Sequence, residues 1–157
     1  VFILPVGPVG QYPRLARICN LERISLRNLW CFNMDEYLTD GGDWVPIDHP
    51  LSFRGHMRRS FLDLLDDDLS PPDEQVIFPD PRDLRKVPLM MQDLGGVDVC
   101  YAGIGINGHI AFNEPPEPDE EMSAEEFAEL PTRVLELSRE TRTINSVTVV
   151  VIRLKIR

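Results

Sequence analysis

Short apolar runs alternate along this chain with segments in which apolar residues recur at helical spacing. Each run is bounded mainly by Gly, Pro, Asn or Asp, which is typical of a buried strand. The pattern predicts strands over residues 1–4, 29–32, 76–78 and 97–104. Two further strands are predicted because residues 133–137 alternate apolar with polar positions and residues 147–156 are rich in β-branched side chains.

The segments between the first strands have the signals of helices. A helix is expected to start near Pro13, with Leu15, Ile18 and Cys19 on one face. A second helix is predicted over residues 51–65, where five apolar residues share a face. These five residues are Phe53, Met57, Phe61, Leu64 and Leu65.

Two more helices complete the pattern. One is predicted over residues 84–94, and a capping box formed by Ser123 and Glu126 predicts a short helix that ends at Ala128 or Glu129. Strands that alternate with helices indicate βαβ units. The sequence therefore predicts an α/β protein with an open, mostly parallel sheet and flanking helices.

Three polar or glycine-rich loops each follow a predicted strand. They are Gly7–Gln11, Asn33–Tyr37 and Gly105–Glu114. In a parallel sheet, all three loops lie at the carboxyl edge, where open α/β sheets bind their ligands. We therefore expect the chemistry of this protein to lie on these loops.

Composition and charge narrow the classes of partner. The chain has 157 residues, of which 43% are apolar, and this predicts one domain with a core. Its net charge of −10 argues against a nucleic-acid partner, which requires clustered Lys and Arg, but still permits a small anionic ligand. No apolar run approaches the roughly 20 residues that span a bilayer, and no signal peptide is visible. The opening strand suggests that residues are missing upstream.

The cysteines point to a reducing compartment. Cys19, Cys31 and Cys100 are odd in number, widely spaced and set in apolar runs. We therefore expect buried, reduced thiols in a cytoplasmic protein.

The three loops contain residues suited to proton transfer and anion binding. His109, among glycines and polar neighbours, is suited to acid–base work, although a lone histidine is more often structural. Asp35 and Glu36 are adjacent, so one is expected to face the cleft as a base and the other to point away. Alternatively, both carboxylates are simply the solvated end of the strand and have no catalytic role. The segment from Gly7 to Gln11 leads into a helix and predicts an anion site, or else a plain βα turn.

Two other chemistries are disfavoured. Gly103-x-Gly105-x-x-Gly108 matches the dinucleotide fingerprint only as a pattern, because Pro115 and Pro116 stop any helix that would face a pyrophosphate. The three histidines do not have metal-ligand spacing, and no pair of cysteines supplements them. We therefore expect no metal and no redox cofactor.

Four segments closely resemble the glucosamine-6-phosphate deaminases (isomerases). They are Asn-Met-Asp-Glu-Tyr at 33–37, His-Pro-Leu-Ser at 49–52, Gly-His-Ile-Ala-Phe-Asn-Glu-Pro at 108–115 and Glu-Thr-Arg-Thr-Ile-Asn-Ser at 140–146. Their order and spacing match, and the resemblance extends from Val1 to about Ser146. It implies a Rossmann-like α/β fold and one domain of this family over residues 1–157, without much of its C-terminal part.

The resemblance also implies a reaction and residue roles. The family converts glucosamine 6-phosphate and water to fructose 6-phosphate and ammonia without a metal or redox cofactor. By position, Asp35 is the base that moves a proton between C2 and C1, His109 assists ring opening, and Glu114 orients and polarises the imidazole. Contacts to the sugar phosphate are expected from Gly7, Gly10, Gln11, Gly105, Gly108 and Ala111. Family members are often oligomers, so a homo-oligomer is a further expectation.

Three departures keep other functions open. Asn107 stands where the family has Asp, and it cannot stabilise an imidazolium by charge. Pro8 and Val9 interrupt the phosphate loop, and Val147 occupies the place of a phosphate-binding arginine. The alternatives are a related isomerase that acts on another phosphosugar and a non-catalytic sugar-phosphate sensor.

Overall fold

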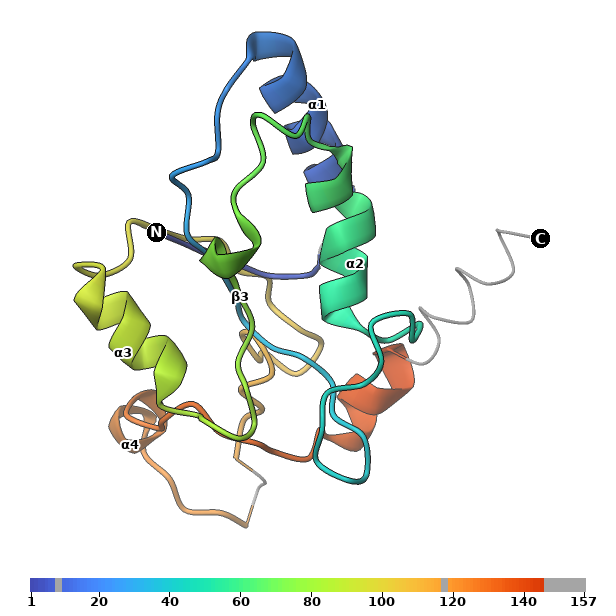
Figure 1. Cartoon of the computed structure of the whole chain (residues 1–157). Helices are drawn as coiled ribbons and strands as arrows, with labels where there is room; N and C mark the ends of the chain where they lie inside the picture. The colour runs from blue at the N-terminus through green and yellow to red at the C-terminus, as the bar shows by residue number, and fades with distance from the viewer. Residues whose placement is uncertain (8–9, 117–118, 146–157) are drawn as a thin grey trace. The chain divides into compact units, whose positions relative to one another are not determined.

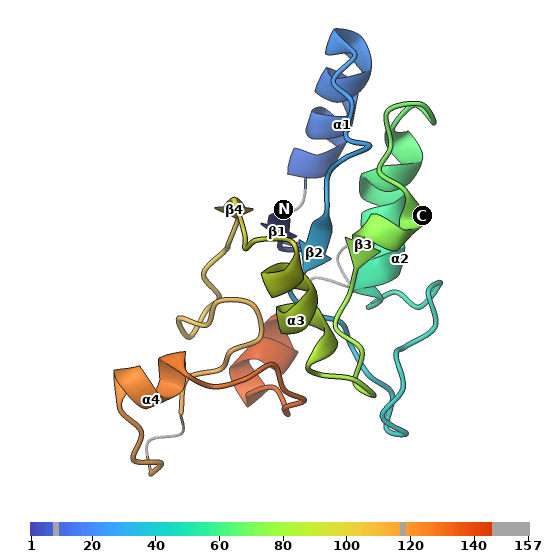
Figure 2. The same cartoon turned by 60° about the vertical axis from the view of Figure 1, so that its left-hand side comes forward.

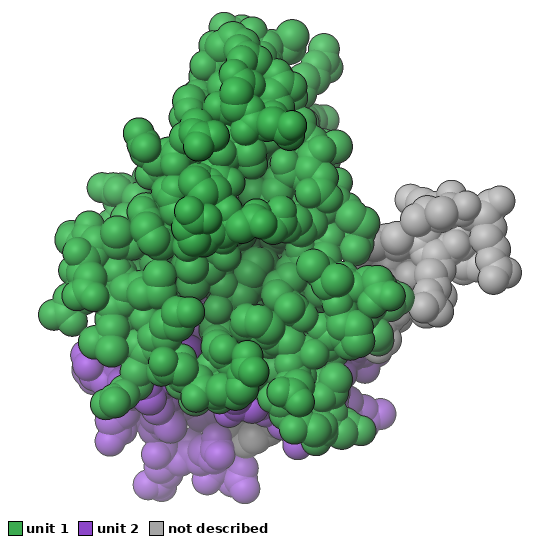
Figure 3. Space-filling model, in the orientation of Figure 1, with its two compact units in different colours: residues 1–103 green, residues 104–157 purple. Residues whose placement is uncertain are grey.

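A computed structural model describes residues 1–7, 10–116 and 119–145 of the chain. The chain divides into two compact units, Val1–Gly103 and Ile104–Arg157, which are coloured separately in Figure 3. The strand predicted over residues 147–156 lies outside the described residues. Each unit is described by itself below.

The first unit is built on a four-stranded sheet in which every pair of neighbours is parallel. Its strands are β1 (Phe2–Leu4), β2 (Cys31–Asn33), β3 (Val76–Ile77) and β4 (Val99–Cys100). Their order is β3-β2-β1-β4 (Figure 2), as in the first four strands of the Rossmann fold. The predicted α/β class and the parallel sheet are confirmed.

Helices connect the strands in the predicted order. The connecting helices are α1 (Gln11–Glu22), α2 (Phe53–Ser60) and α3 (Lys86–Asp93), with two short 3₁₀ helices at Leu62–Leu64 and Asp73–Gln75. Right-handed crossovers place α1 and α2 on one face of the sheet, and the reversal of strand order at β4 places α3 on the other. Figure 1 shows α1 beside α2, with α3 apart from both.

The core lies where α1 and α2 pack against the sheet. The ring centroids of Tyr12 and Phe61 are 5.3 Å apart, and the Tyr12 hydroxyl donates to the carbonyl oxygen of Pro5. Cys19 and Cys31 are buried free thiols, as expected, and burial raises the pKa of Cys31 to about 12. These contacts fix helix α1 against β1 and β2.

Two predicted helix faces need correction. Helix α1 buries Tyr12, Ala16 and Cys19, whereas the predicted Leu15 and Ile18 are 40% and 51% exposed. The helix face that contains Tyr12 is the buried one, because the Tyr12 ring packs on the ring of Phe61. The helix predicted over residues 51–65 is shorter, because α2 ends at Ser60 and a 3₁₀ turn follows. Met57, Phe61 and Leu65 are buried as predicted, while Leu64 is 44% exposed.

The predicted strand over residues 97–104 is also much shorter. Within this segment only Val99 and Cys100 join the sheet, and Cys100 is exposed rather than buried. Strand β4 pairs only with β1 and lies at the edge of the described sheet, so it lacks a second neighbour to cover it. The expectation of a buried Cys100 is therefore wrong.

The second unit contains little regular structure. Helix α4 (Ala124–Ala128) begins at the predicted capping box, in which Ser123 and Glu126 each accept from the backbone N–H of the other. Residues 133–137 form no strand, because no neighbouring strand among the described residues pairs with them. Residues 139–145 are helical, although the sequence indicated only a polar segment. No helix in the described part of the chain is long and apolar enough to cross a membrane.

Candidate active site

The first unit places two candidate segments at the carboxyl edge of adjacent strands. Gly7 follows β1 and Asp35 follows β2, its hydrogen-bonded neighbour. On the other side of β1, a Cβ added to Gly103 would lie 3.9 Å from the carbonyl oxygen of Gly7, so the chains that leave β1 and β4 run close together. Because the strand order reverses between β1 and β4, this edge is a topological switch point, where α/β sheets bind ligands.

The predicted anion segment leads into the N-terminus of α1. Gly10 is the N-cap residue, with a φ of 99° that favours glycine, and Gln11 is the first helical residue. The first turn holds no acidic side chain, and backbone N–H groups at the start of a helix suit a bound anion. Contacts of Gly7, Gly10 and Gln11 with phosphate stay predictions.

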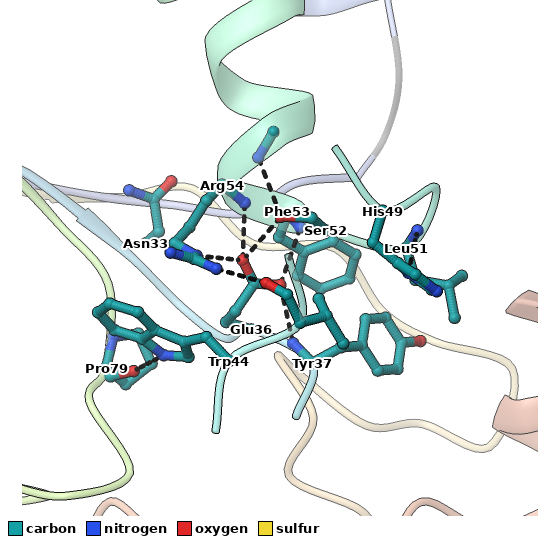
Figure 4. A network of polar contacts seen from close by, with 12 residues as sticks. Asn33, Glu36, Tyr37, Trp44, His49, Leu51, Ser52, Phe53, Arg54 and Pro79 are labelled. Atoms are coloured by element: carbon teal, nitrogen blue, oxygen red, sulfur yellow. Dashed lines mark hydrogen bonds and ion pairs between the residues drawn. The ribbon is translucent and has the colours of Figure 1, made fainter. Parts of the chain in front are cut away.

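Of the two adjacent carboxylates after β2, Glu36 is buried and hydrogen-bonded on both of its oxygens. Its side chain is 1% exposed and accepts from the backbone N–H groups of Phe53 and Arg54, both at 2.9 Å. The Ser52 hydroxyl donates to it at 3.2 Å, and Arg54 Nε pairs with it at 3.0 Å (Figure 4). Glu36 therefore anchors the N-terminus of α2, and the role of Asp35 as a base stays a prediction.

In the second unit, the structure brings together Asn107, His109 and Glu114. Asn107 Oδ1 lies 2.8 Å from His109 Nδ1 and also accepts from the His109 backbone N–H at 3.3 Å. The Asn107 amide nitrogen donates to Glu114 Oε2. Glu114 Oε2 itself lies 3.6 Å from His109 Nδ1, and the two side chains are only 10% and 13% exposed. The predicted histidine and carboxylate thus form one connected group.

Glu114 is held ionised by this group. Burial acts to raise its pKa, but hydrogen bonds from Asn107, Thr141 and the Ser138 N–H outweigh it. Nearby His109 acts in the same direction, so the pKa of Glu114 lies below its ordinary value of 4.5. At neutral pH, the carboxylate can orient the imidazole and stabilise its protonated form.

Two members of the group were missed in the sequence. The Ser138 hydroxyl accepts from Asn107 Nδ2 at 3.3 Å, and the Thr141 hydroxyl lies 3.3 Å from His109 Nδ1. Ser138 also accepts from the Thr141 backbone N–H at 3.3 Å, just before helical residues 139–145. This Ser-x-x-Thr pattern at the start of a helix is the signal that could have found them.

The glycines of the loop leave room for the imidazole ring of His109. A Cβ added to Gly105 would overlap the imidazole ring of His109, and the Gly105 N–H donates to the His109 carbonyl oxygen at 2.8 Å. Gly108 and Ala111 both have positive φ, 91° and 55°, and so turn the chain tightly on either side of the ring. Their expected contacts with substrate stay predictions.

Positive charge is available locally in the second unit. A cavity of about 620 Å³ is lined by Arg133, Arg139 and Arg142 and by three carboxylates, Glu114, Glu120 and Glu136. Arg142 pairs with Glu136 at 2.9 Å, so the arginines are local cations in a lining that carries no net charge. Among the described residues, no group of three or more His, Cys, Asp or Glu side chains could hold a metal ion.

Comparisons with known proteins find relatives of this chain. No family model matches the chain. A glucosamine-6-phosphate deaminase of Parabacteroides distasonis is 36% identical over 118 residues, which cover 71% of this chain and 41% of the relative. The enzyme of the same name from Bacillus pumilus is 32% identical over 145 residues, 88% of this chain and 53% of its own length. The chain thus spans about half the length of the curated relatives it matches.

A solved structure is similar as well. It is a monomeric glucosamine-6-phosphate deaminase, described as a missing link of the NagB superfamily, with a TM-score of 0.72 and 27% identity. The match covers 92% of this chain and 56% of that one. Nothing in these relatives supports the expected homo-oligomer. Together, sequence and structure show that the chain is a divergent member of the glucosamine-6-phosphate deaminase family.

Proposed function

We propose that the protein converts glucosamine 6-phosphate and water to fructose 6-phosphate and ammonia. The observation that carries this proposal is the connected group of Asn107, His109 and Glu114 on one short loop. It presents an imidazole whose Nδ1 is engaged and whose Nε2 makes no hydrogen bond within the described residues. Such an imidazole can exchange a proton near neutral pH.

Each candidate side chain has a role in this reaction. His109 Nε2 transfers the proton that opens the sugar ring, and Glu114 stabilises the imidazolium formed on the way. Asp35, at the end of β2, moves the proton between C2 and C1 of the open sugar. A carboxylate suits this step because it is ionised at neutral pH.

The same proposal assigns the binding of the sugar phosphate. The N-terminus of α1, with Gly7, Gly10 and Gln11, holds the phosphate through backbone N–H groups. Gly105, Gly108 and Ala111 border the sugar beside His109. The overall conversion is redox-neutral, so the proposal includes no redox cofactor, and it assigns every proton transfer to side chains and not to a metal. A cytoplasmic location remains part of the proposal.

The decisive experiment measures both products from the purified full-length protein. Glucosamine 6-phosphate is added, and ammonia and fructose 6-phosphate are quantified in separate assays. Release of both in equal amounts is expected. Binding without either product, measured by calorimetry, would overturn the proposal and favour a sugar-phosphate sensor, which is the alternative that Asn107 supports. Turnover of another phosphosugar alone would favour a related isomerase.

A further inference from the structure

We propose that Ser138 and Thr141 are positioning residues that, with Asn107, hold neutral His109 in the tautomer with its proton on Nδ1. The observation behind this proposal is a set of hydrogen bonds with only one consistent direction. The tautomer follows from the geometry of the second unit alone, whereas its effect on turnover rests on the proposed function.

The direction of every hydrogen bond is set by Glu114. An ionised carboxylate has no hydrogen and can only accept. The Asn107 amide nitrogen and the Ser138 backbone N–H, the latter at 3.3 Å, both donate to it. Each of these groups must therefore point its hydrogen toward Glu114.

The amide orientation of Asn107 follows at once. Its nitrogen is committed to Glu114 and to the Ser138 hydroxyl oxygen, 3.3 Å away. Its carbonyl oxygen must then face His109, and it lies 2.8 Å from Nδ1. Asn107 thus shows His109 Nδ1 an acceptor and no donor.

Thr141 has the same property. The Ser138 hydroxyl donates to its oxygen at 3.1 Å. Because the Asn107 oxygen requires a proton on Nδ1, the Thr141 hydroxyl hydrogen must turn away from the ring, toward Glu114, whose pKa this hydroxyl lowers. The remaining lone pair faces His109 Nδ1 at 3.3 Å. Thr141 is 2% exposed, so water cannot replace it in this arrangement. Two acceptors therefore converge on Nδ1, and only a proton on Nδ1 satisfies both.

The consequence for the reaction is that His109 begins as a proton acceptor at Nε2. The proton of the anomeric hydroxyl moves to Nε2 and gives an imidazolium beside Glu114, 3.6 Å away. The same proton then passes to the ring oxygen as the bond between C1 and that oxygen breaks and the C1 carbonyl forms. The step is balanced, because the imidazole ends as it began.

The first test needs no substitution. Nitrogen-15 NMR of labelled protein at neutral pH distinguishes the two ring nitrogens of each histidine, and His109→Gln identifies the signals of His109. We expect the proton on Nδ1 and a bare Nε2. The opposite tautomer would overturn the proposal. This result does not depend on turnover, so a protein inactive on glucosamine 6-phosphate would refute the proposed function while leaving the tautomer to be judged by NMR.

The second test separates positioning from packing. Thr141→Val keeps the shape but removes the hydroxyl, and we expect a mixture of tautomers with kcat lower by about tenfold to a hundredfold and KM little changed. Thr141→Ser restores both readouts. The matched control is Thr143→Val in the same helical segment, whose exposed hydroxyl donates to the Arg139 carbonyl oxygen at 2.8 Å. Thr141→Val with the wild-type tautomer and kcat would overturn the role of Thr141. If that variant does not fold, the wild-type NMR result and Thr141→Ser still decide.

Discussion

Each unit contains a carboxylate that is almost wholly buried, and the two are held by different kinds of partner. Glu36 is held by the start of a helix and by a guanidinium, through the backbone of Phe53 and both the backbone and the side chain of Arg54. Glu114 is held by an amide, a hydroxyl and one backbone N–H, and an imidazole lies beside it.

The difference shows how a buried carboxylate is recognised as structural or functional. The donors around Glu36 cannot lose or gain a proton near neutral pH, so the group can only stabilise the fold. The group around Glu114 ends at an imidazole, which can change its charge. Burial and hydrogen bonding alone do not distinguish the two carboxylates, whereas the chemistry of their partners does.

The largest expected effect concerns Asp35, the neighbour of Glu36. Asp35→Asn removes the proposed base, and we expect kcat to fall by roughly 10²–10⁴-fold while substrate binding is largely kept. Rapid-quench or steady-state assays of ammonia release measure kcat, and calorimetry with glucosamine 6-phosphate measures binding. A variant that turns over at the wild-type rate would remove Asp35 from the mechanism.

The next effect concerns stability rather than rate. Glu36→Gln places an amide nitrogen among donors that have lost their acceptor, which should lower the free energy of unfolding by about 3 kcal/mol. Urea unfolding followed by circular dichroism measures the change. Exposed Glu22→Gln at the end of α1 is the control and should unfold like the wild type. Unchanged stability in Glu36→Gln would mean that the two carboxylates are not as different as described.

A smaller loss of activity than in Asp35→Asn is expected when the space occupied by the His109 ring is narrowed. In Gly105→Ala, the new methyl group would overlap the ring of His109 and displace it, which should lower kcat by about a hundredfold. The control is Gly41→Ala, where an added Cβ would lie 3.6 Å from Thr39 Oγ1, an ordinary contact. Equal rates for the two variants would show that the ring can move without cost.

Much of the fold could be predicted from local patterns. Short apolar runs bounded by turn residues gave three of the strands nearly correctly, and the capping box at Ser123 located α4. The buried face of α1 could not be predicted, because two overlapping apolar stripes contain Tyr12 and Leu15. The choice between them depends on Phe61, a residue distant in sequence. The edge position of β4 is likewise a property of the sheet and not of its residues.

The site divides in the same way. Asn107, His109 and Glu114 lie within eight residues, so their chemistry was visible in one stretch of sequence. Ser138 lies 31 residues from the Asn107 that it bonds, and Ser52 lies 16 residues from Glu36. Hydroxyl residues are common, and although the Ser-x-x-Thr pattern can indicate that Ser138 begins a helix, it does not show which side chain the hydroxyl contacts. Only the tertiary structure shows which carboxylate each serves.

Asn107→Asp makes the group around Glu114 more like an ion pair, and its effect is expected to be the smallest. The variant removes one donor that lowers the pKa of Glu114 and adds a like charge beside it, so both changes raise that pKa. The new carboxylate also favours the imidazolium of His109. We expect the pH dependence of kcat/KM on its acidic side to move up by about one unit, equivalent to about 1.4 kcal/mol.

The stability of the same variant gives an independent measurement with a definite sign. In the wild type, Glu114 has a folded pKa below its ordinary 4.5, so its contribution is present above that value and is lost as pH falls through the lower, folded one. Raising the folded pKa toward the ordinary value shrinks this contribution, so less of it is left to lose in acid. The fall in melting temperature between pH 6 and pH 3 should therefore be smaller in Asn107→Asp. If the curves of variant and wild type coincide, the Asn107 amide does not support Glu114, and the contrast with Glu36 loses its physical basis.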